Sequence, residues 1–242
     1  MLKNASDILV ERREIWESKT LIRKLYRKWY RLIADALRSG KTLELGGGSG
    51  NLKQFFPGVI TSDVVYAPWL DAVLDAQGLP FKNRGLTNIV LFDVLHHLKA
   101  PVIFFGEAER VLAPGGRIVM VEPYVSWLSF LVYRFLHQEG MHWRADPFRV
   151  ERSKENDPFD GNQALPTLIF EKQRAKFSDL FPRLRIIGEK RMDSLLYPLS
   201  GGFHHPSLCP LFLTKAFEYV EDLMQPICRF TAFRLFLVLE KY

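Results

Sequence analysis

The segment Thr42-Leu-Glu-Leu-Gly-Gly-Gly-Ser-Gly-Asn-Leu52 carries the strongest structural signal in the chain. It begins as a short β-rich run, continues as a glycine loop and leads into a stretch that we predict to be helical from Asn51. Gly46, Gly48 and Gly50 allow the backbone to turn tightly and a ligand to lie against bare peptide, with helix N–H groups pointing at it. This order of strand, glycine loop and helix predicts a ligand-binding turn in an α/β protein.

The spacing of the glycines argues against a dinucleotide site. A dinucleotide fingerprint requires Gly-x-Gly-x-x-Gly, because its third glycine lets the helix pack closely against the strand beside a pyrophosphate. Here the spacing is Gly46-x-Gly48-x-Gly50 and residue 51 is Asn, so the pattern fails. A phosphate-free ligand that carries an amino acid and a nucleoside fits better, because Glu44 can take up an ammonium group through nearby backbone or water.

Around this segment the chain alternates short β-rich runs with helical stretches, such as Pro101 to Leu112, which ends in an Ala-Pro-Gly-Gly stop signal. Such alternation predicts an α/β fold with a mostly parallel sheet covered by helices on both faces. Seven strands are predicted. They are Thr42–Leu45, Val59–Val65, Ala72–Asp75, Asn88–Phe92, Arg117–Glu122, Leu184–Ile187 and Phe233–Leu239.

The length of 242 residues favours one elaborated domain over two. Within it we predict an N-terminal helical segment at 1–39 and a ligand-binding core at 40–122. Two intervals, 124–183 and 194–230, are too long to be simple connections. We interpret both as insertions at the substrate end of the sheet, because connections that leave the carboxyl ends of strands carry the binding loops of such folds. We expect them to form a lid of helices and loops.

Much of the formal net charge of +6 comes from basic residues in the N-terminal segment. Basic and apolar residues both recur there at helical spacing, so we expect an apolar stripe facing the protein and a basic stripe facing water. Contact of the basic stripe with a membrane surface or a nucleic acid is the alternative. The basic stripe comprises Arg23, Lys24, Arg27, Lys28 and Arg31, and the apolar stripe Leu21, Leu25, Trp29, Leu32 and Ile33.

The sequence indicates a cytoplasmic protein without a transmembrane segment. Its longest apolar run, Val125 to Tyr133, is too short to cross a bilayer, and its N-terminus lacks the apolar core of a signal peptide. The two cysteines, Cys209 and Cys228, have no paired spacing. We therefore expect neither a disulfide framework nor a metal site.

Four motifs between about residues 40 and 122 follow the order found in class I S-adenosylmethionine-dependent methyltransferases of the type 11 group. The stretch Glu44 to Gly50 resembles the first motif, and Asp75 to Phe81 resembles the third-strand motif. Phe92-Asp-Val-Leu-His-His-Leu98 is similar to the fourth-strand motif, and Leu112 to Glu122 to the helix-turn-strand signature that follows. The resemblance implies a Rossmann-like fold and S-adenosyl-L-methionine as the cofactor.

The resemblance also implies roles for individual residues. Asp63 matches the acid that hydrogen-bonds the ribose hydroxyls, Asp75 and Ala76 match the pair that contacts adenine, and Asp93 belongs to the motif that closes over the methionine end. Because only eleven residues separate Asp63 from Asp75, we expect the intervening helix to be truncated to little more than Tyr66–Leu70. The implied cofactor-binding residues are Glu44, Gly46, Gly48, Gly50, Asp63, Asp75, Ala76 and Asp93.

Methyl transfer from a sulfonium is an in-line displacement whose leaving group is already activated by its positive charge. The protein therefore mainly aligns the acceptor with the methyl group in a water-poor pocket. A general base is needed only where the acceptor must lose a proton. We expect candidate bases at the mouth of this pocket, with His97, Glu122 and Tyr124 as the catalytic candidates and His137 as a further one.

The acceptor is the least defined part of the prediction. Enzymes that methylate amino groups of nucleic-acid bases usually carry Asp/Asn-Pro-Pro-aromatic after the fourth strand, and Asp93-Val-Leu-His96 makes a nucleic-acid acceptor unlikely. Aromatic residues in both insertions suit a small-molecule, lipid-linked or glycan-type acceptor, and we expect O-methylation. The alternatives are a cofactor-binding accessory protein without catalysis, and an RNA methyltransferase that uses the basic N-terminal helix. Peripheral membrane contact also stays open.

Overall fold

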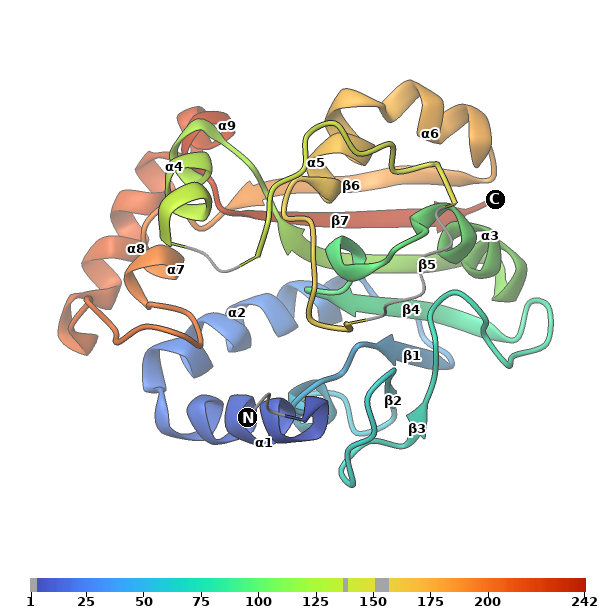
Figure 1. The fold of residues 1–242 in the computed structure, drawn as a ribbon, viewed down its shortest axis with the longest axis horizontal. Helices are drawn as coiled ribbons and strands as arrows, with labels where there is room; N and C mark the ends of the chain where they lie inside the picture. The colour runs from blue at the N-terminus through green and yellow to red at the C-terminus, as the bar shows by residue number, and fades with distance from the viewer. Residues whose placement is uncertain (1–3, 137–138, 151–156) are drawn as a thin grey trace.

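The computed structural model describes residues 4–136, 139–150 and 157–242, and places seven strands in one sheet of order β3-β2-β1-β4-β5-β7-β6 (Figure 1). Strands β1 to β5 are parallel, whereas β7 runs antiparallel to both β5 and β6. The predicted fold class and number of strands are confirmed. The strands are β1 (Thr42–Leu45), β2 (Ile60–Asp63), β3 (Ala72–Val73), β4 (Leu86–Phe92), β5 (Leu112–Pro123), β6 (Leu184–Met192) and β7 (Arg234–Lys241).

Strand β6 is longer than its sequence predicts. The predicted strand ended at Ile187, before a glycine, but pairing with β7 continues to Met192. An irregularity in the register between Ile186 and Gly188 absorbs the glycine without ending the ladder. Tertiary pairing therefore extends this strand beyond its local signal.

Helices cover both faces of the sheet because the central strands bury side chains in both directions. On one face, α2 (Thr20–Ala36) packs Ile22, Trp29 and Ile33 against alternate residues of β4 and β5. On the other face, α3 (Pro101–Val111) and α6 (Arg174–Leu180) contribute aromatic side chains, among them Phe105 and Phe177, whose ring centroids are 4.9 Å apart.

The interval 124–183 forms two different structures. Its first part contains α4 (Trp127–Leu136), which lies beyond the carboxyl ends of the strands with α8 (Thr214–Leu223) and α9 (Cys228–Thr231) (Figure 1). Its second part contains α5 (Leu165–Thr167), the π-helical turn η3 (Leu168–Lys172) and α6, and packs Phe170, Phe177 and Phe181 into the main core. The expectation that the whole interval is a substrate-side insertion is therefore corrected, since its aromatic side chains complete one face of the sheet.

The interval 194–230 lies at the same end of the molecule as α4 (Figure 1). It consists of short helices joined by turns. These are α7 (Leu196–Leu199), η4 (Leu211–Leu213), α8 (Thr214–Leu223), η5 (Gln225–Ile227) and α9 (Cys228–Thr231).

The N-terminal segment forms α1 (Ala5–Ser18) and α2. The apolar stripe of α2 is buried as expected, but its basic stripe does not face water throughout. Lys24 Nζ lies 3.0 Å from Glu218 of α8, and Lys28 Nζ lies 3.2 Å from the buried carboxylate of Asp193. These two lysines therefore fasten α2 to the rest of the protein rather than offering a free basic surface.

No helix within the described part of the chain has the length and apolar character needed to cross a membrane.

Candidate cofactor and acceptor site

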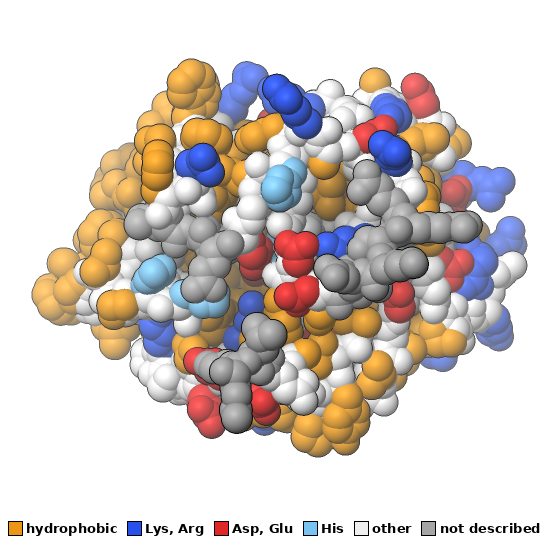
Figure 2. Space-filling model, in the orientation of Figure 1, with side chains coloured by type: hydrophobic (Ala, Val, Ile, Leu, Met, Phe, Trp, Pro, Cys, Tyr) orange, Lys and Arg blue, Asp and Glu red, His pale blue; other side chains and the backbone are white. Residues whose placement is uncertain are grey.

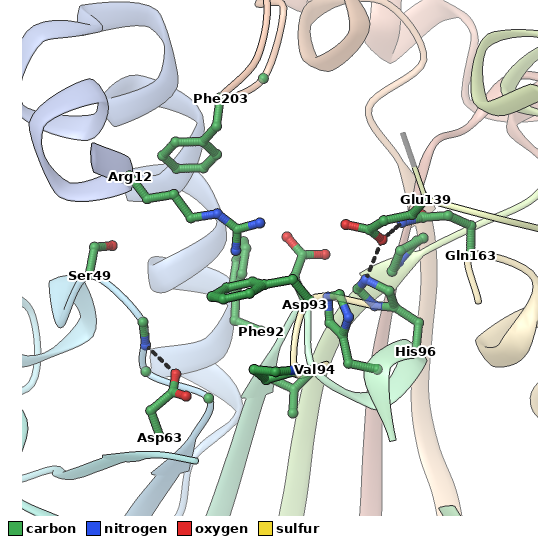
Figure 3. Close-up of a pocket in the computed structure, with 18 of the residues that line it drawn as sticks. Arg12, Ser49, Asp63, Phe92, Asp93, Val94, His96, Glu139, Gln163 and Phe203 are labelled. Atoms are coloured by element: carbon green, nitrogen blue, oxygen red, sulfur yellow. Dashed lines mark hydrogen bonds and ion pairs between the residues drawn. The ribbon is translucent and has the colours of Figure 1, made fainter. Parts of the chain in front are cut away.

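A cavity of about 790 Å³ lies at the carboxyl ends of the parallel strands. One half is lined by the glycine loop 46–49 together with Asp63 and residues 74–77. The other half is lined by side chains from distant parts of the chain. Arg12 and Phe203 reach in from one side, and His96, Glu139 and Gln163 lie on the other (Figure 3).

The glycine loop has left-handed backbone at each of its three predicted glycines. The φ angles of Gly46, Gly48 and Gly50 are 67°, 48° and 73°. A Cβ atom on Gly46 would lie 2.2 Å from Val94 Cγ2, and one on Gly50 would lie 2.7 Å from the Trp69 ring, whereas none of the protein atoms comes closer than 3.9 Å to a Cβ on Gly48. Gly46 and Gly50 thus permit close packing, and Gly48 leaves open space at the cavity.

The helix predicted from Asn51 is only one turn of 3-10 helix, η1 (Asn51–Gln54). The expected truncation before Asp75 goes further, because residues 64–71 contain no helix. Trp69, which lies in this segment, donates a hydrogen bond from its indole nitrogen to Gly48 O at 2.8 Å. An indole side chain therefore supports the glycine loop where a helix was expected.

Asp63 connects the end of β2 to the glycine loop (Figure 3). Its Oδ2 accepts a hydrogen bond from the N–H of Gly48 at 2.9 Å, and its Oδ1 accepts one from the N–H of Val65 at 2.9 Å. Burial raises the pKa of this carboxyl despite the backbone donors. Asp63 lines the cavity, so its carboxylate both orders the loop and faces the space where the resemblance places the ribose.

Glu44 lies at the carboxyl end of β1 beneath the loop and is buried. Its Oε2 has no hydrogen-bond partner among the described residues. Burial, reinforced by the negative charge of Asp63, raises the pKa of Glu44 to about 8. A buried carboxyl that lacks a partner and lines a cavity suits a cationic ligand group, because an ammonium would supply the missing donor.

Asp75 and Ala76 reach the same cavity. Asp75 is exposed, and its Oδ1 accepts a hydrogen bond from the N–H of Gln77 at 2.8 Å. Ala76 is buried. The structure therefore brings the residues implied for the adenine end to the wall that contains Asp63, and their contact with adenine stays a prediction.

Asp93 lies at the end of β4 in a left-handed conformation, with φ 56°, which is unusual for a residue other than glycine. An ion pair holds it there. Arg234 Nη1 from the start of β7 lies 2.6 Å from Asp93 Oδ1, and the rings of Trp29, Phe92 and Tyr197 surround the guanidinium at 5.1–5.3 Å. Arg234 is fully buried, and its Nε and Nη2 have no hydrogen-bond partner among the described residues.

His96 lies between two carboxylates. Its Nδ1 is 2.8 Å from Glu122 Oε2, and its Nε2 is 3.3 Å from Glu139 Oε2 (Figure 3). Burial opposes protonation of the ring, but the hydrogen bonds to Glu122 and Glu139 outweigh it, and the pKa of His96 is raised to about 10. At neutral pH His96 is therefore an imidazolium that holds the two carboxylates together.

The structure does not place Glu122 at the mouth of the cavity. Glu122 is fully buried, and its Oε1 accepts hydrogen bonds from the N–H groups of Val94 and Leu95 at 2.9 and 2.8 Å. Both of its oxygens are thus engaged by the turn that follows β4, since Oε2 contacts His96 Nδ1. The expectation of a catalytic base at this position is corrected, because the carboxylate is fully buried and does not line the cavity.

Tyr124 is also placed differently from the prediction. Its side chain is buried on the face of the sheet that packs against α3 and α6, and its hydroxyl lies 3.3 Å from Glu171 Oε2. It does not line the cavity. Residues 122 and 124 share the direction of Met120 because side chains alternate along a strand, and that direction leads into the core.

His97 is the catalytic candidate that the structure brings to the cavity. Its Nδ1 lies 3.3 Å from Asp160 O. Burial, together with the positive charge of His96, lowers the pKa of His97 to about 4. His97 is therefore neutral at physiological pH. The further candidate His137 lies outside the described residues.

The acceptor half also contains three charged residues that no sequence motif indicates, namely Arg12, Glu139 and Arg234. They come from α1, from the loop after α4 and from β7, so no local motif joins them. One signal was present in the sequence. Arg234 is a lone cation within the apolar run 232–239, and a charge in a buried strand is retained only where a partner satisfies it.

Two overlapping groups of side chains in the described chain could supply metal ligands, and both contain His96. One joins it to His97 and Glu139, the other to Asp93 and Glu122. Since both ring nitrogens of His96 face carboxylates, we assign a proton rather than a metal to this position. The cofactor implied by the glycine loop is organic, and the residues described above fit it.

Comparison with known proteins agrees with this site. The sequence matches the methyltransferase domain family over residues 19–158, more than half of the chain. No curated protein sequence matches it.

Several solved structures share the fold. A SAM-dependent methyltransferase from Archaeoglobus fulgidus has a TM-score of 0.55 at 11% identity, over 90% of this chain and 94% of that chain. Geranyl diphosphate C-methyltransferase from Streptomyces coelicolor A3(2) has a TM-score of 0.51 at 13% identity, over 91% and 81%. The PH0226 protein from Pyrococcus horikoshii OT3 has a TM-score of 0.50 at 13% identity, over 91% of each chain.

The family match, the strand order and the glycine loop agree on one assignment: the chain belongs to the methyltransferase domain family, as a class I S-adenosylmethionine-dependent enzyme.

Proposed function

We propose that this enzyme transfers the methyl group of S-adenosylmethionine to an oxygen of a small-molecule or lipid-linked acceptor. One observation carries the proposal. The cavity that begins at the glycine loop continues without interruption to a neutral histidine, His97, flanked by the charged pair His96 and Glu139.

The cofactor end supports the proposal through three carboxyl groups. Asp63 and Asp75 line the same wall of the cavity. In this proposal Asp63 accepts from the ribose hydroxyls and Asp75 contacts adenine. Glu44 offers its unpartnered Oε2 to the ammonium of the methionine end. Each is a residue type that accepts hydrogen bonds from the donor it would face.

The acceptor end supplies a hydrogen-bond acceptor that is neutral at physiological pH. A hydroxyl acceptor that donates a hydrogen bond to His97 would be held in the cavity that also contains the glycine loop. S-adenosylmethionine, when bound, would supply the methyl group and take back the electrons of its carbon–sulfur bond, so that methylation of the hydroxyl would yield a protonated ether. A protonated ether is a far stronger acid than an imidazolium, so even a weakly basic His97 can take the proton.

The alternative of an RNA methyltransferase receives less support. Lys24 and Lys28 of the basic helix are engaged with acidic side chains of the same chain, which leaves fewer cations for phosphate contacts. In the accessory alternative the protein binds the cofactor without methyl transfer, and the absence of any methylated product would support it.

The first test uses S-adenosylmethionine carrying a ¹³C-methyl group. Extracts of cells that produce the protein are incubated with enzyme and cofactor, and the labelled product is isolated by mass and examined by NMR. We expect a methyl resonance attached to oxygen. A label on nitrogen or carbon would contradict O-methylation, and cofactor binding without any labelled product would support the accessory role.

The second test addresses His97. His97→Gln should lower kcat by about 10²-fold or more while leaving the affinity for the cofactor unchanged, because a positioned proton acceptor contributes roughly that much. His142→Gln is the matched control, since His142 is exposed and does not line the cavity. Equal activities for the two variants would exclude His97 from the reaction.

A further inference from the structure

The helices beyond the carboxyl ends of the strands expose large apolar side chains on one side. Trp127 and Phe135 of α4 are 80% and 75% exposed, and Phe212 beside α8 is 82% exposed. Figure 2 shows hydrophobic side chains gathered at the end of the molecule where α4, α8 and α9 lie. We name the following residues the apolar face: Trp127, Phe130, Leu131, Phe135, Leu211, Phe212, Tyr219, Leu223, Ile227 and Phe230.

These residues belong to elements that contact one another. Helix α4 packs against α9, and η5 joins α9 to α8. Contiguous exposed apolar surface of this kind is uncommon on a soluble protein and marks a binding surface.

The outer side of α4 has the pattern of a helix that lies in a membrane interface. Its exposed residues are Trp127, Phe130, Leu131, Arg134 and Phe135, which recur at helical spacing with one cation and no acid among them. Aromatic and aliphatic side chains can enter the acyl region while an arginine extends along them to reach lipid phosphates.

The charges around the apolar face favour anionic lipid over a second copy of the chain. Arg134, Lys215 and Arg229 are exposed on these elements, whereas the exposed acid is Asp222. Of the remaining acids of α8, Glu218 pairs with Lys24, and Glu221 is buried. An isologous dimer would bring like-charged arginines into an apolar contact, and charged residues are depleted from such interface cores.

The apolar face and the cavity share walls. The inner side of α4 presents Val132 and Tyr133 to the cavity, and its outer side carries Leu131 and Phe135. Leu208, which lines the cavity as well, is 73% exposed. An amphiphile could therefore place its polar group in the cavity while its tail stays in the lipid that covers these helices.

We propose that the apolar face docks this enzyme on the surface of an anionic bilayer, where the cavity receives an acceptor carried on a lipid. The acceptor class rests on the proposed function, whereas the docking does not. Binding is peripheral, through α4 and the turns around α8 and α9.

The test measures co-sedimentation of the full chain with vesicles, without cofactor or acceptor. One vesicle type contains phosphatidylcholine only, the other phosphatidylcholine with phosphatidylglycerol. We expect binding to the anionic vesicles and weaker binding to the neutral ones.

The double variant Leu131→Glu/Phe135→Glu should lower the partition coefficient by about tenfold or more, because two apolar anchors are lost and two charges must enter the interface. Leu180→Glu, at an exposed position of α6 at the other end of the molecule (Figure 1), should bind like the wild type.

Arg134→Gln tests the electrostatic part and should reduce the preference for anionic vesicles by about fivefold, the effect of one cation near the surface. Circular dichroism confirms that each variant is folded. The proposal is overturned if the wild type does not bind anionic vesicles, or if the double variant binds them as well as the wild type does. It is also overturned if light scattering finds a dimer that the double variant converts to monomer, with no vesicle binding.

These outcomes are independent of methyl transfer. A protein that binds vesicles but not S-adenosylmethionine would refute the proposed function alone, and one that methylates a soluble acceptor without binding vesicles would refute the docking alone.

Discussion

Glu44 is the residue whose ionisation is most directly coupled to the cofactor. Its pKa of about 8 means that the carboxyl is largely protonated at pH 7 in the free protein. A bound ammonium would favour the carboxylate and lower this pKa, so binding of S-adenosylmethionine should release close to one proton at pH 7. Calorimetry in buffers of different ionisation enthalpy measures this number. Glu44→Gln should abolish the release, and proton release equal to wild type would assign it to another group.

Asp63 tests whether the ribose lies where the family resemblance places it. Asp63→Ala should weaken cofactor binding by about 1–3 kcal/mol, since an acceptor for the ribose hydroxyls is lost along with the bond to Gly48. Asp63→Asn, which keeps one acceptor oxygen, should lose less. An alanine variant that folds and binds as tightly as wild type would show that the ribose is held elsewhere.

The glycine loop is an element in which three similar residues have different roles. Gly46→Ala would push a Cβ to 2.2 Å from Val94 Cγ2 as well as strain a positive φ, so this variant should be destabilised. Gly48→Ala meets no protein atom closer than 3.9 Å, so its stability should fall by only about 1 kcal/mol while cofactor affinity falls more. Thermal unfolding and calorimetry separate the two effects. Equal losses of stability would indicate that Gly48 has only a structural role.

The turn after β4 is stabilised by the protonated ring of His96, which contacts Glu122 and Glu139. The pKa of His96, about 10 in the folded protein, exceeds its ordinary 6.5, so its stabilising effect is complete below pH 6.5 and is lost as pH rises through 10. The free energy of unfolding of the wild type should therefore fall between pH 6.5 and 9.5 by up to a few kcal/mol. His96→Asn should be less stable at pH 6.5 and show a flatter profile in urea unfolding. Parallel profiles would mean that His96 is not charged in the folded state.

Residues of the site that belong to one local motif could be predicted from the sequence, whereas residues brought together by tertiary packing could not. The glycine loop, Asp63 and Asp75 could be predicted from the sequence, because they lie in one contiguous third of the chain. Their order, their spacing and the family resemblance all identify them there. The prediction that Glu122 lies at the mouth of the cavity was wrong. The side of the strand to which Glu122 points, and the hydrogen bonds that it accepts, cannot be read from the spacing of the motif. Arg12, Glu139 and Arg234 were missed because only tertiary packing brings them to the cavity.

Across the protein as a whole, the central strands are extensively buried, whereas the segments that cover the cavity, such as α1, bury few side chains. The stretch 149–162 is the part of the predicted lid that we expect to exchange fastest, and residues 151–156 of it lie outside the described residues. Phe159 lies against the guanidinium of Arg12 at 4.9 Å, and Asp160 pairs with Lys99 at 2.7 Å. Helix α1 therefore contacts the described part of this stretch, and Arg12 and Phe159 line the same cavity.

Hydrogen exchange tests this cover directly. In α1 only Leu9 and Trp16 are buried, whereas α2 buries seven residues, so amides of α1 should exchange faster than those of α2 in the free protein. Leu9 and Arg12 line the cavity beside the glycine loop, and α1 also contacts the protein through Arg13, whose guanidinium lies 4.7 Å from the Trp69 ring.

Adding S-adenosylmethionine should slow exchange in α1 and in residues 46–50, because the cofactor would fill the space between them. Exchange in α8, which lies away from the cofactor half, should be unchanged and serves as the internal control. If α1 were as protected as α2 before any ligand is added, or did not respond to the cofactor, it would be a fixed part of the fold, and the cofactor would have to enter from the acceptor side.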